Sequence, residues 1–253
     1  MNHPKSGIRL LTYNVQTGFA AGSYAEYVTR GWQHIFPNRT RLRTLENIGH
    51  ALRDFDIVGL QEVDRGSFRT GDINLTQVLA STGQFTHWYD QVNRQVGPLA
   101  ACGNGLLSRQ AAVAIEHHAL PGIPGRGTLV ATFANALVIG VVHLALDRIS
   151  RRRQLDFLCE RFRHEPRAIV MGDFNCASDD HDLKRFLIGA CMTPAGSAEP
   201  TFPTWRPRAA LDHILVSRDI EVEVASELHW RYSDHLPRSA TVRCQSIAHP
   251  TAA

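Results

Sequence analysis

The sequence predicts an α/β (α+β) fold in one layered domain over residues 1–253. Apolar runs typical of buried strands alternate with helical patterns from one end of the chain to the other. No Ser/Gly-rich linker, low-complexity tract or internal repeat divides the 253 residues, and a chain of this length can bury one large core. These observations favour a single domain in which sheets and helices are interleaved.

The amino-terminal third predicts strand, helix, strand and helix in that order. Residues 8–13 form an apolar run, which predicts the first strand. Residues 39–55 predict a helix because apolar residues recur at helical spacing (Leu42, Leu45, Ile48 and Leu52). Residues 56–63 resume as strand, and residues 74–82 predict a second helix.

The rest of the chain is richer in strands. Short β-rich runs separated by Gly, Pro and Asn are expected to be antiparallel neighbours: 85–92, 103–109, 111–120, 127–134 and 136–144. A helix over 150–162 places Leu155, Leu158 and Phe162 on one side. The last predicted elements are strand 168–175, a helix around 182–190, and strands 211–217, 220–228 and 240–244.

Composition limits the class of protein. The formal net charge of +3 suits an anionic partner but falls short of a dedicated nucleic-acid binder. Five scattered cysteines without a C-x-x-C pair predict neither a disulfide framework nor a zinc cage, and they fit a reducing compartment. Because no apolar run is long enough to span a bilayer and residues 1–14 hold no signal-like segment, we expect a cytoplasmic protein without a transmembrane segment.

Polar residues stand at the ends of the apolar strands. The run AIVMGDFN ends in Asp173 and Asn175, which is also ordinary turn chemistry after a strand. The same arrangement recurs along the chain, at Asn14, Glu62, His143, Asp212, Asp234 and His235. If these strand ends converge, they form one acidic cluster with two imidazoles.

Such a cluster suits a hard divalent cation. Mg²⁺ prefers oxygen ligands and is usually held by one or two carboxylates together with substrate phosphate. Zinc fits less well, because the candidate ligands are rich in oxygen and no H-E-x-x-H pair is present. The pattern therefore indicates metal-assisted displacement at phosphorus, with Mg²⁺ as the expected ion and Mn²⁺ as the alternative.

The ordered motifs LTYN, LQEV, GNGLLSR, VVHL, GDFN, LDHILVS and SDH resemble the endonuclease/exonuclease/phosphatase superfamily. They span residues 10–236, so the resemblance covers nearly the whole chain. It implies a four-layer β-sandwich, in which two mixed sheets pack face to face and are flanked by helices. The active site is then expected at one edge of the sandwich.

The resemblance also implies roles for individual residues. Asn14 and Glu62 match metal-site residues, with Glu62 as the main Mg²⁺ ligand, and Asp234 matches a further metal-site carboxylate. Asp173 matches the residue that orients or activates water, and Asn175 matches its phosphate-binding neighbour. The histidine that contacts phosphate corresponds to His143, and the catalytic His235 is held by Asp212. Either Asp173 or the His235–Asp212 pair takes the proton from water.

Four further residues are expected to bind substrate. Asn104 in GNGLLSR fits a phosphate contact, although it is also a common turn residue. Arg69 and Arg126 stand on Gly-flanked loops from which a guanidinium can reach phosphate. Trp205 either walls the pocket or anchors its Pro-rich loop on the core. The triplet Arg151 to Arg153 is interpreted as a solvated helix face.

Three functions remain open at this point. A Mg²⁺-dependent phosphodiesterase acting on DNA or RNA fits the basic charge and the nuclease-like motifs, and it is narrowly preferred. A hydrolase of lipid or small-molecule phosphates fits the modest size of that charge, and a membrane lipid is then the alternative substrate. A binding module without catalysis is disfavoured, because every expected catalytic position is filled.

Overall fold

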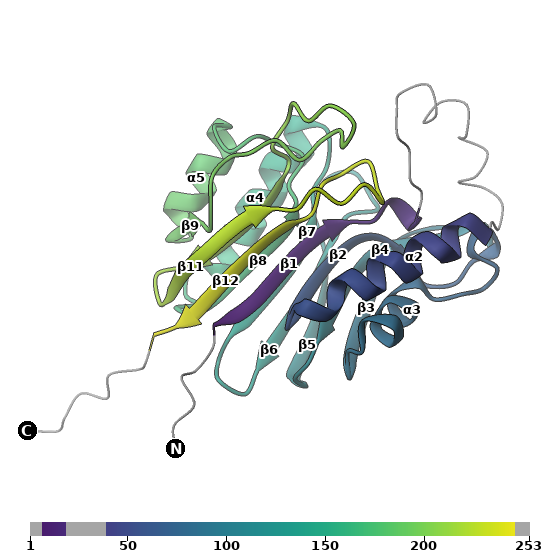
Figure 1. The fold of residues 1–253 in the computed structure, drawn as a ribbon. Coiled ribbons are helices and arrows are strands. Elements are labelled where there is room, and N and C mark those ends of the chain that lie inside the picture. The colour runs from purple at the N-terminus through teal and green to yellow at the C-terminus, as the bar shows by residue number, and fades with distance from the viewer. Residues whose placement is uncertain (1–6, 19–38, 246–253) are drawn as a thin grey trace, which may run out of the picture.

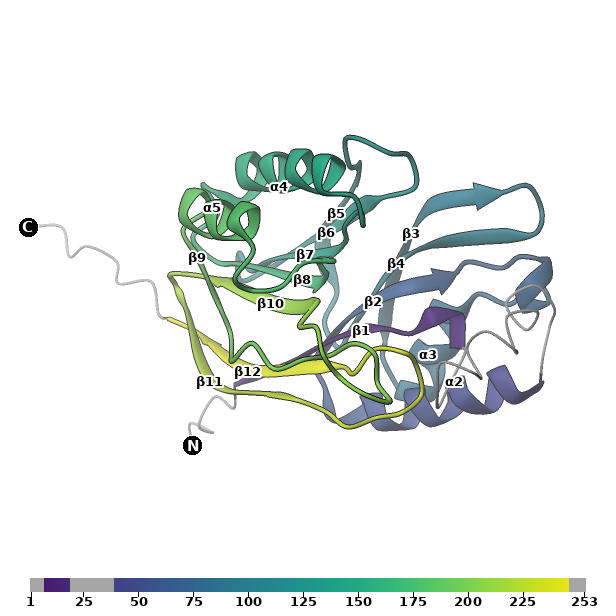
Figure 2. The same cartoon turned by 90° about the horizontal axis from the view of Figure 1, so that it is seen from above.

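The computed structural model describes residues 7–18 and 39–245 of the chain. Residues 1–6, 19–38 and 246–253 lie outside the described part. The prediction that residues 1–14 hold no signal-like segment therefore falls partly on residues outside it. Two six-stranded sheets pack face to face, with helices on the outer face of each (Figures 1 and 2). The predicted α/β class and the four-layer sandwich are confirmed.

The first sheet joins the two ends of the described chain. Its strand order is β11 (Ile220–Glu227), β12 (Arg238–Cys244), β1 (Ile8–Asn14), β2 (Ile57–Asp64), β4 (Ala100–Ser108) and β3 (His87–Val96). Strands β1 and β2 are parallel, and the other neighbours are antiparallel. The carboxyl ends of β1 and β2 therefore meet at one edge of the sheet.

The second sheet repeats this design. Its order is β5 (Ala112–Ala119), β6 (Gly127–Phe133), β7 (Val138–His143), β8 (Ala168–Asp173), β10 (Asp212–Ser217) and β9 (Met192–Pro194). Strands β7 and β8 are the parallel pair, with His143 in register with Asp173. Because β10 runs antiparallel to β8, its first residue, Asp212, also pairs with Asp173.

Four helices and three short 3-10 turns complete the described fold. Helices α2 (Arg39–Ala51) and α3 (Leu75–Gly83) cover the first sheet, and α4 (Arg148–Phe162) and α5 (His181–Gly189) cover the second. The turns are η1 (Gln16–Gly18), η3 (Leu52–Asp54) and η4 (Phe68–Thr70). The helix predicted over 39–55 ends earlier, at Ala51, because the chain tightens into η3.

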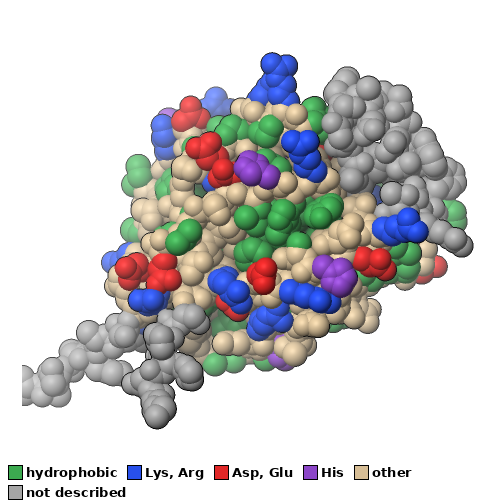
Figure 3. Space-filling view, in the orientation of Figure 1, with side chains coloured by type: hydrophobic (Ala, Val, Ile, Leu, Met, Phe, Trp, Pro, Cys, Tyr) green, Lys and Arg blue, Asp and Glu red, His purple; other side chains and the backbone are tan. Residues whose placement is uncertain are grey.

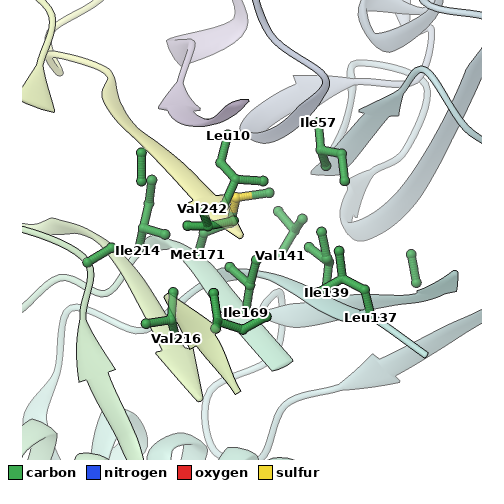
Figure 4. Close-up of a cluster of buried hydrophobic side chains, with 14 of the residues drawn as sticks. Leu10, Ile57, Leu137, Ile139, Val141, Ile169, Met171, Ile214, Val216 and Val242 are labelled. Atoms are coloured by element: carbon green, nitrogen blue, oxygen red, sulfur yellow. The ribbon is translucent and has the colours of Figure 1, made fainter. Parts of the chain in front are cut away.

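Three layers of apolar side chains hold the sandwich together. Between the sheets, side chains from both interdigitate, among them Leu10, Ile57, Val141, Met171 and Val242 (Figure 4). Leu155, Leu158 and Phe162 of α4 pack on the second sheet, as their spacing predicts. Leu45, Ile48 and Leu52 pack on the first sheet, whereas Leu42 is exposed. Rigid strands therefore support the strand ends that carry the polar cluster.

The arginine triplet corrects one expectation. Arg152 and Arg153 are exposed, but Arg151 is buried. Its guanidinium donates to the backbone carbonyls of Ala145 and Leu146 and lies 3.7 Å from a carboxylate oxygen of Asp180. The interpretation of all three residues as a solvated face is therefore wrong for Arg151, because the first turn of α4 lies against the connection that follows β7.

Candidate active site

The carboxyl ends of β1, β2 and β8 bring three predicted residues into contact. Asn14 is buried at the end of β1, and its Nδ2 donates to Oδ2 of Asp173 at 3.1 Å. The same Nδ2 lies 3.4 Å from Oε1 of Glu62. The Oδ1 atom of Asn14 accepts from the backbone N–H of Gln16 at 3.1 Å, which fixes the orientation of the amide. Asn14 thus joins the carboxylates of the two sheets.

Glu62 stands where the pairing of β2 with β4 is interrupted. The register shifts between Gln61 and Val63, and Glu62 has a φ of 58°, in the left-handed region. Its carbonyl oxygen accepts from Oγ1 of Thr17 at 3.0 Å. A non-glycine residue held in this conformation is uncommon and is often found at a functional site. The bulge turns the Glu62 carboxylate out of the strand ladder toward Asn14.

The turn after β8 holds Asp173 and Asn175 by hydrogen bonds at both residues. Oδ1 of Asp173 accepts from the backbone N–H of Asn175 at 2.9 Å, and Nδ2 of Asn175 donates to the carbonyl of Leu144, also at 2.9 Å. This is the turn chemistry that the sequence suggests. It leaves Oδ2 of Asp173 facing Asn14 and the two histidines.

Two imidazoles face Asp173. Nε2 of His143 lies 3.5 Å from Oδ2 of Asp173, and Nε2 of His235 lies 3.8 Å from the same atom. Nδ1 of His235 lies 2.8 Å from Oδ2 of Asp212, and since a carboxylate only accepts, this nitrogen carries the proton. Asp212 is held in turn by Oγ1 of Thr201, which donates to Oδ2 at 2.6 Å.

Burial and charge shift the pKa values of these groups in different directions. Burial lowers the pKa of His143 to about 4, which favours the neutral imidazole. For His235, burial acts in the same direction but is outweighed by the carboxylates of Asp212, Asp173 and Asp234, and the pKa rises to about 10. Burial also raises the pKa of Asp173. The two histidines therefore have different charges in the absence of a metal.

The donor set at Glu62 fits a divalent cation. Burial raises the pKa of Asp234 to about 6, and the negative charge of Glu62 adds to this effect. Two carboxylates that repel each other are the environment that a hard cation relieves. Ser233 contacts both Asn14 and Asp234. Its Oγ donates to the backbone carbonyl of Asn14 at 2.7 Å and lies 3.2 Å from Oδ1 of Asp234.

A second acidic group lies among the described residues. Ligand atoms of Asp173, Asp212 and His235 fall within 4.8 Å of one another. In this group the nearest atoms of Asp212 and His235 already bond each other. The oxygen atoms of Glu62 and Asp234 are therefore the freer ligands for a cation.

A cavity of about 440 Å³ opens beside Glu62 and His143. Two of the residues predicted to bind substrate, Asn104 and Arg126, line it. Asn104 is fully buried and donates both amide hydrogens, to the carbonyls of Gly127 at 2.8 Å and Val141 at 3.2 Å. Its Oδ1 atom has no partner among the described residues. Both donors of this amide are therefore used inside the protein, and its acceptor is buried without a partner in the described part of the chain.

The other two predicted substrate-binding residues are outside the cavity lining. Nε of Arg69 pairs with Oδ2 of the buried Asp64 at 2.6 Å, and its Nη2 lies 3.2 Å from Oγ1 of Thr17. Trp205 is half-buried in the loop before β10. Sequence reasoning missed Thr201, Ser233 and the cavity residue Arg94, since only their tertiary contacts reveal a role.

The strand-end carboxylates, the His235–Asp212 pair and the adjoining cavity define a metal-assisted phosphoric ester hydrolase. The chain belongs to the endonuclease/exonuclease/phosphatase family, whose sequence model matches residues 11–235. Members of this family are phosphoric ester hydrolases and generally depend on a divalent metal. The predicted family and enzyme class are confirmed.

Solved structures with this fold include proteins of different stated activity. An endonuclease/exonuclease/phosphatase from Beutenbergia cavernae is 18% identical, with 95% of this chain and 72% of that chain covered at a TM-score of 0.76. A mannosyl-6-phosphatase from Bacteroides thetaiotaomicron is 15% identical, with 93% and 99% covered and a TM-score of 0.70. A beta toxin from Staphylococcus aureus is 15% identical, with 92% and 99% covered and a TM-score of 0.61.

The comparison with curated proteins found no significant match. In residues 7–18 and 39–245, no helix has the length and apolar character that crossing a membrane requires.

Proposed function

We propose that this chain is a Mg²⁺-dependent phosphodiesterase and that nucleic acid, DNA or RNA, is its leading substrate class. The observation that carries the proposal is the position of Oδ2 of Asp173. This atom lies within 3.8 Å of Asn14, His143 and His235, so one carboxylate oxygen faces the metal-site amide and both imidazoles. Such convergence fits a single phosphate held between a metal and proton-transfer groups.

The metal-site residues in this proposal are Glu62, Asp234 and Asn14. Oxygen donors of this kind suit Mg²⁺, and Mn²⁺ is the alternative. When bound, the ion neutralises charge on the phosphate and on the group that leaves. The backbone N–H of Gln16 orients the side-chain amide of Asn14, and Ser233 holds the backbone carbonyl of the same residue.

The remaining residues act on water and phosphate. Asp173 orients the attacking water, and Asn175 binds a phosphate oxygen beside it. His143, buried with its Nε2 toward Asp173, contacts phosphate. His235 is held by Asp212 through Nδ1, which leaves Nε2 for the reacting groups. Asp173 and the His235–Asp212 pair lie close enough to share the proton taken from water, so they act as one unit.

Hydrolysis of lipid or small-molecule phosphates is the second candidate. Figure 3 shows basic and acidic side chains interspersed over the face in view, without a broad area of one sign. A surface of this kind gives weak long-range attraction for a polymeric anion. The mannosyl-6-phosphatase that shares the fold also fits this candidate.

A substrate panel tests the proposal. Mg²⁺-dependent, EDTA-sensitive hydrolysis is measured on single- and double-stranded DNA, abasic-site DNA, RNA, sphingomyelin, phosphoinositides and mannose 6-phosphate. We expect cleavage of a nucleic acid, with an affinity that falls steeply as salt rises. Turnover confined to lipids or to the monoester would contradict the nucleic-acid assignment and support the second candidate.

A further inference from the structure

The cavity beside the metal-site residues has two walls from different sheets. The β3–β4 hairpin of the first sheet supplies one wall, and the connection from β5 to β6 together with residues 145–147 supplies the other. Figure 2 shows both projecting at the end where β1, β2 and β7 finish. Its 440 Å³ falls within the range of about 300–1,000 Å³ usual for small-molecule sites. The space is therefore large enough for a group attached to the scissile phosphate.

The two walls are in contact at Arg94 and Gly125. A Cβ atom placed on Gly125 would lie 3.2 Å from Cβ and 3.3 Å from Cδ of Arg94, so the aliphatic stem of this arginine packs on the glycine. Arg94 lines the cavity although its side chain is exposed overall. The stem of Arg94 is thus held by the opposite wall of the cavity that this residue lines.

A second arginine, Arg126, lines the same cavity. Burial lowers the pKa of Arg126, the carboxylates of Glu62 and Asp173 act against this, and the positive charge of Arg94 adds to the lowering. Arg126 therefore lies within electrostatic reach of the metal-site carboxylate, the water-orienting carboxylate and the other arginine. The cavity beside the proposed site therefore carries two positive charges, those of Arg126 and Arg94.

Neither guanidinium forms an ion pair in the part of the chain that the structure describes. Within residues 7–18 and 39–245, no carboxylate forms an ion pair with Arg94 or Arg126. Besides Glu62, the acidic residue of the lining is Asp147, whose Oδ1 accepts from the N–H of Ser150 at 2.8 Å and caps α4. Two guanidinium groups at one cavity, without an ion-pair partner among the described residues, attract an anion and repel a cation such as choline.

The buried amide of Asn104 adds a different requirement. Its Oδ1 atom needs a donor, since an unpaired buried acceptor costs about 1–3 kcal/mol. A phosphate oxygen without a proton cannot donate, whereas a hydroxyl or N–H group can. This buried oxygen therefore does not bind a second phosphate, which leaves that role to the arginines of the lining.

We propose that this cavity is a subsite for a second phosphate, in which Arg94 binds that phosphate and Arg126 lies between it and the scissile one. The proposal rests on the phosphodiesterase function proposed above. The substrate class is then a phosphate ester whose attached group carries a further phosphate. A nucleotide unit of nucleic acid and a phosphorylated inositol headgroup share this chemistry.

Turnover of two matched esters tests the subsite. Thymidine 5′-(p-nitrophenyl phosphate) is compared with the same compound bearing a 3′-phosphate, which differs only in the second anion. We expect kcat/KM to be at least about tenfold higher for the 3′-phosphorylated ester. This is the effect of one additional charge-assisted hydrogen bond. Arg94→Gln should reduce this ratio to about one, because the preference depends on Arg94.

Arg153→Gln is the matched control, since Arg153 is an exposed arginine of α4 and does not line the cavity. This variant should keep the ratio of the wild type. Equal kcat/KM on the two esters in the wild type would overturn the proposal. So would a ratio that survives Arg94→Gln, or turnover of p-nitrophenylphosphorylcholine that matches turnover of the 3′-phosphorylated ester.

A binding measurement separates the subsite from the catalytic function. Calorimetry in EDTA compares thymidine 5′-phosphate, thymidine 3′,5′-bisphosphate and inositol 1,4,5-trisphosphate on the wild type and Arg94→Gln. A gain from the second phosphate that requires Arg94 supports the subsite even if no ester is hydrolysed, in which case only the proposed function fails. Tighter binding of the bisphosphate indicates that the second phosphate belongs to a nucleotide. Tighter binding of the inositol phosphate alone indicates that it belongs to an inositol headgroup. No gain with either ligand overturns the subsite.

Discussion

Asn14 and Asp173 are 159 positions apart in the sequence, yet the amide nitrogen of one lies 3.1 Å from a carboxylate oxygen of the other. Each residue ends a strand of a different sheet, so this hydrogen bond joins the two halves of the sandwich at the proposed site. Because the same amide nitrogen lies 3.4 Å from Oε1 of Glu62, one side chain orients both carboxylates. In the proposed function, this arrangement links metal binding to water activation.

Asn14→Ala tests this link. We expect kcat on a generic phosphodiester to fall by about 10- to 100-fold, as for other residues that orient metal-site ligands. Thr12→Val is the control, because Thr12 is buried in the same strand and bonds Gln61 at 3.3 Å, away from the site. That variant should lose stability in urea but keep kcat. Equal losses of kcat in the two variants would contradict an orienting role for Asn14.

Glu62→Gln tests the metal site. The substitution keeps the size of the side chain and removes its charge, so the Mg²⁺ concentration for half-maximal activity should rise about tenfold or more. Mg²⁺ should also raise the melting temperature of the wild type and have less effect on the variant. Glu160→Gln, at a side chain 67% exposed on α4, should behave as the wild type. An unchanged Mg²⁺ titration in Glu62→Gln would remove this residue from the site.

Thr201 is expected to position Asp212 and, through it, His235. Its hydroxyl donates to Asp212 and accepts from the backbone N–H groups of Leu211 and Asp212 at 3.2 and 3.3 Å. Thr201→Val should lower kcat about tenfold with little change in KM, and should cost about 1–3 kcal/mol of unfolding free energy. Thr201→Ser keeps the hydroxyl and should restore kcat. Failure of the serine variant to restore it would show that the methyl packing matters instead.

Gly172→Ala should destabilise the strand that carries Asp173. Gly172 has a φ of 152°, and an added Cβ would lie 1.9 Å from the carbonyl oxygen of Val142 on the neighbouring strand. We expect a loss of about 3 kcal/mol or more in urea unfolding, because overpacking and backbone strain add. Gly97→Ala, where φ is also positive but nothing lies within 4 Å, should cost only about 1 kcal/mol. Similar losses at both positions would contradict the steric explanation.

The central cluster is predictable from sequence because strand periodicity and polarity agree there. Asn14, His143 and Asp173 each end an apolar run, and the parallel pairs β1/β2 and β7/β8 bring those ends to one edge. The sequence gives no signal of the bulge at Glu62. Glu62 itself is still predicted as a site residue, because its carboxylate follows an apolar run. The order of the motifs then supplied the four-layer arrangement.

The residues around this centre depend on tertiary contacts that periodicity does not report. Arg94 reaches the cavity only because the β3–β4 hairpin packs against the opposite wall at Gly125. Arg69 has the loop setting of a phosphate-binding residue, but the buried Asp64 five positions earlier pairs with it. Arg151 is covered because the carbonyls of Ala145 and Leu146 accept its hydrogen bonds.

The most direct test of the account is hydrolysis of bis(p-nitrophenyl) phosphate by the wild type and by Asp173→Asn, with Mg²⁺ and with EDTA. The account predicts activity in the wild type that EDTA abolishes. It also predicts that Asp173→Asn lowers kcat by about 100-fold or more while the variant stays folded at the assay temperature, because Asp173 acts on water. Activity of Asp173→Asn in proportion to its folded fraction, or wild-type activity that EDTA leaves intact, would contradict the central claim.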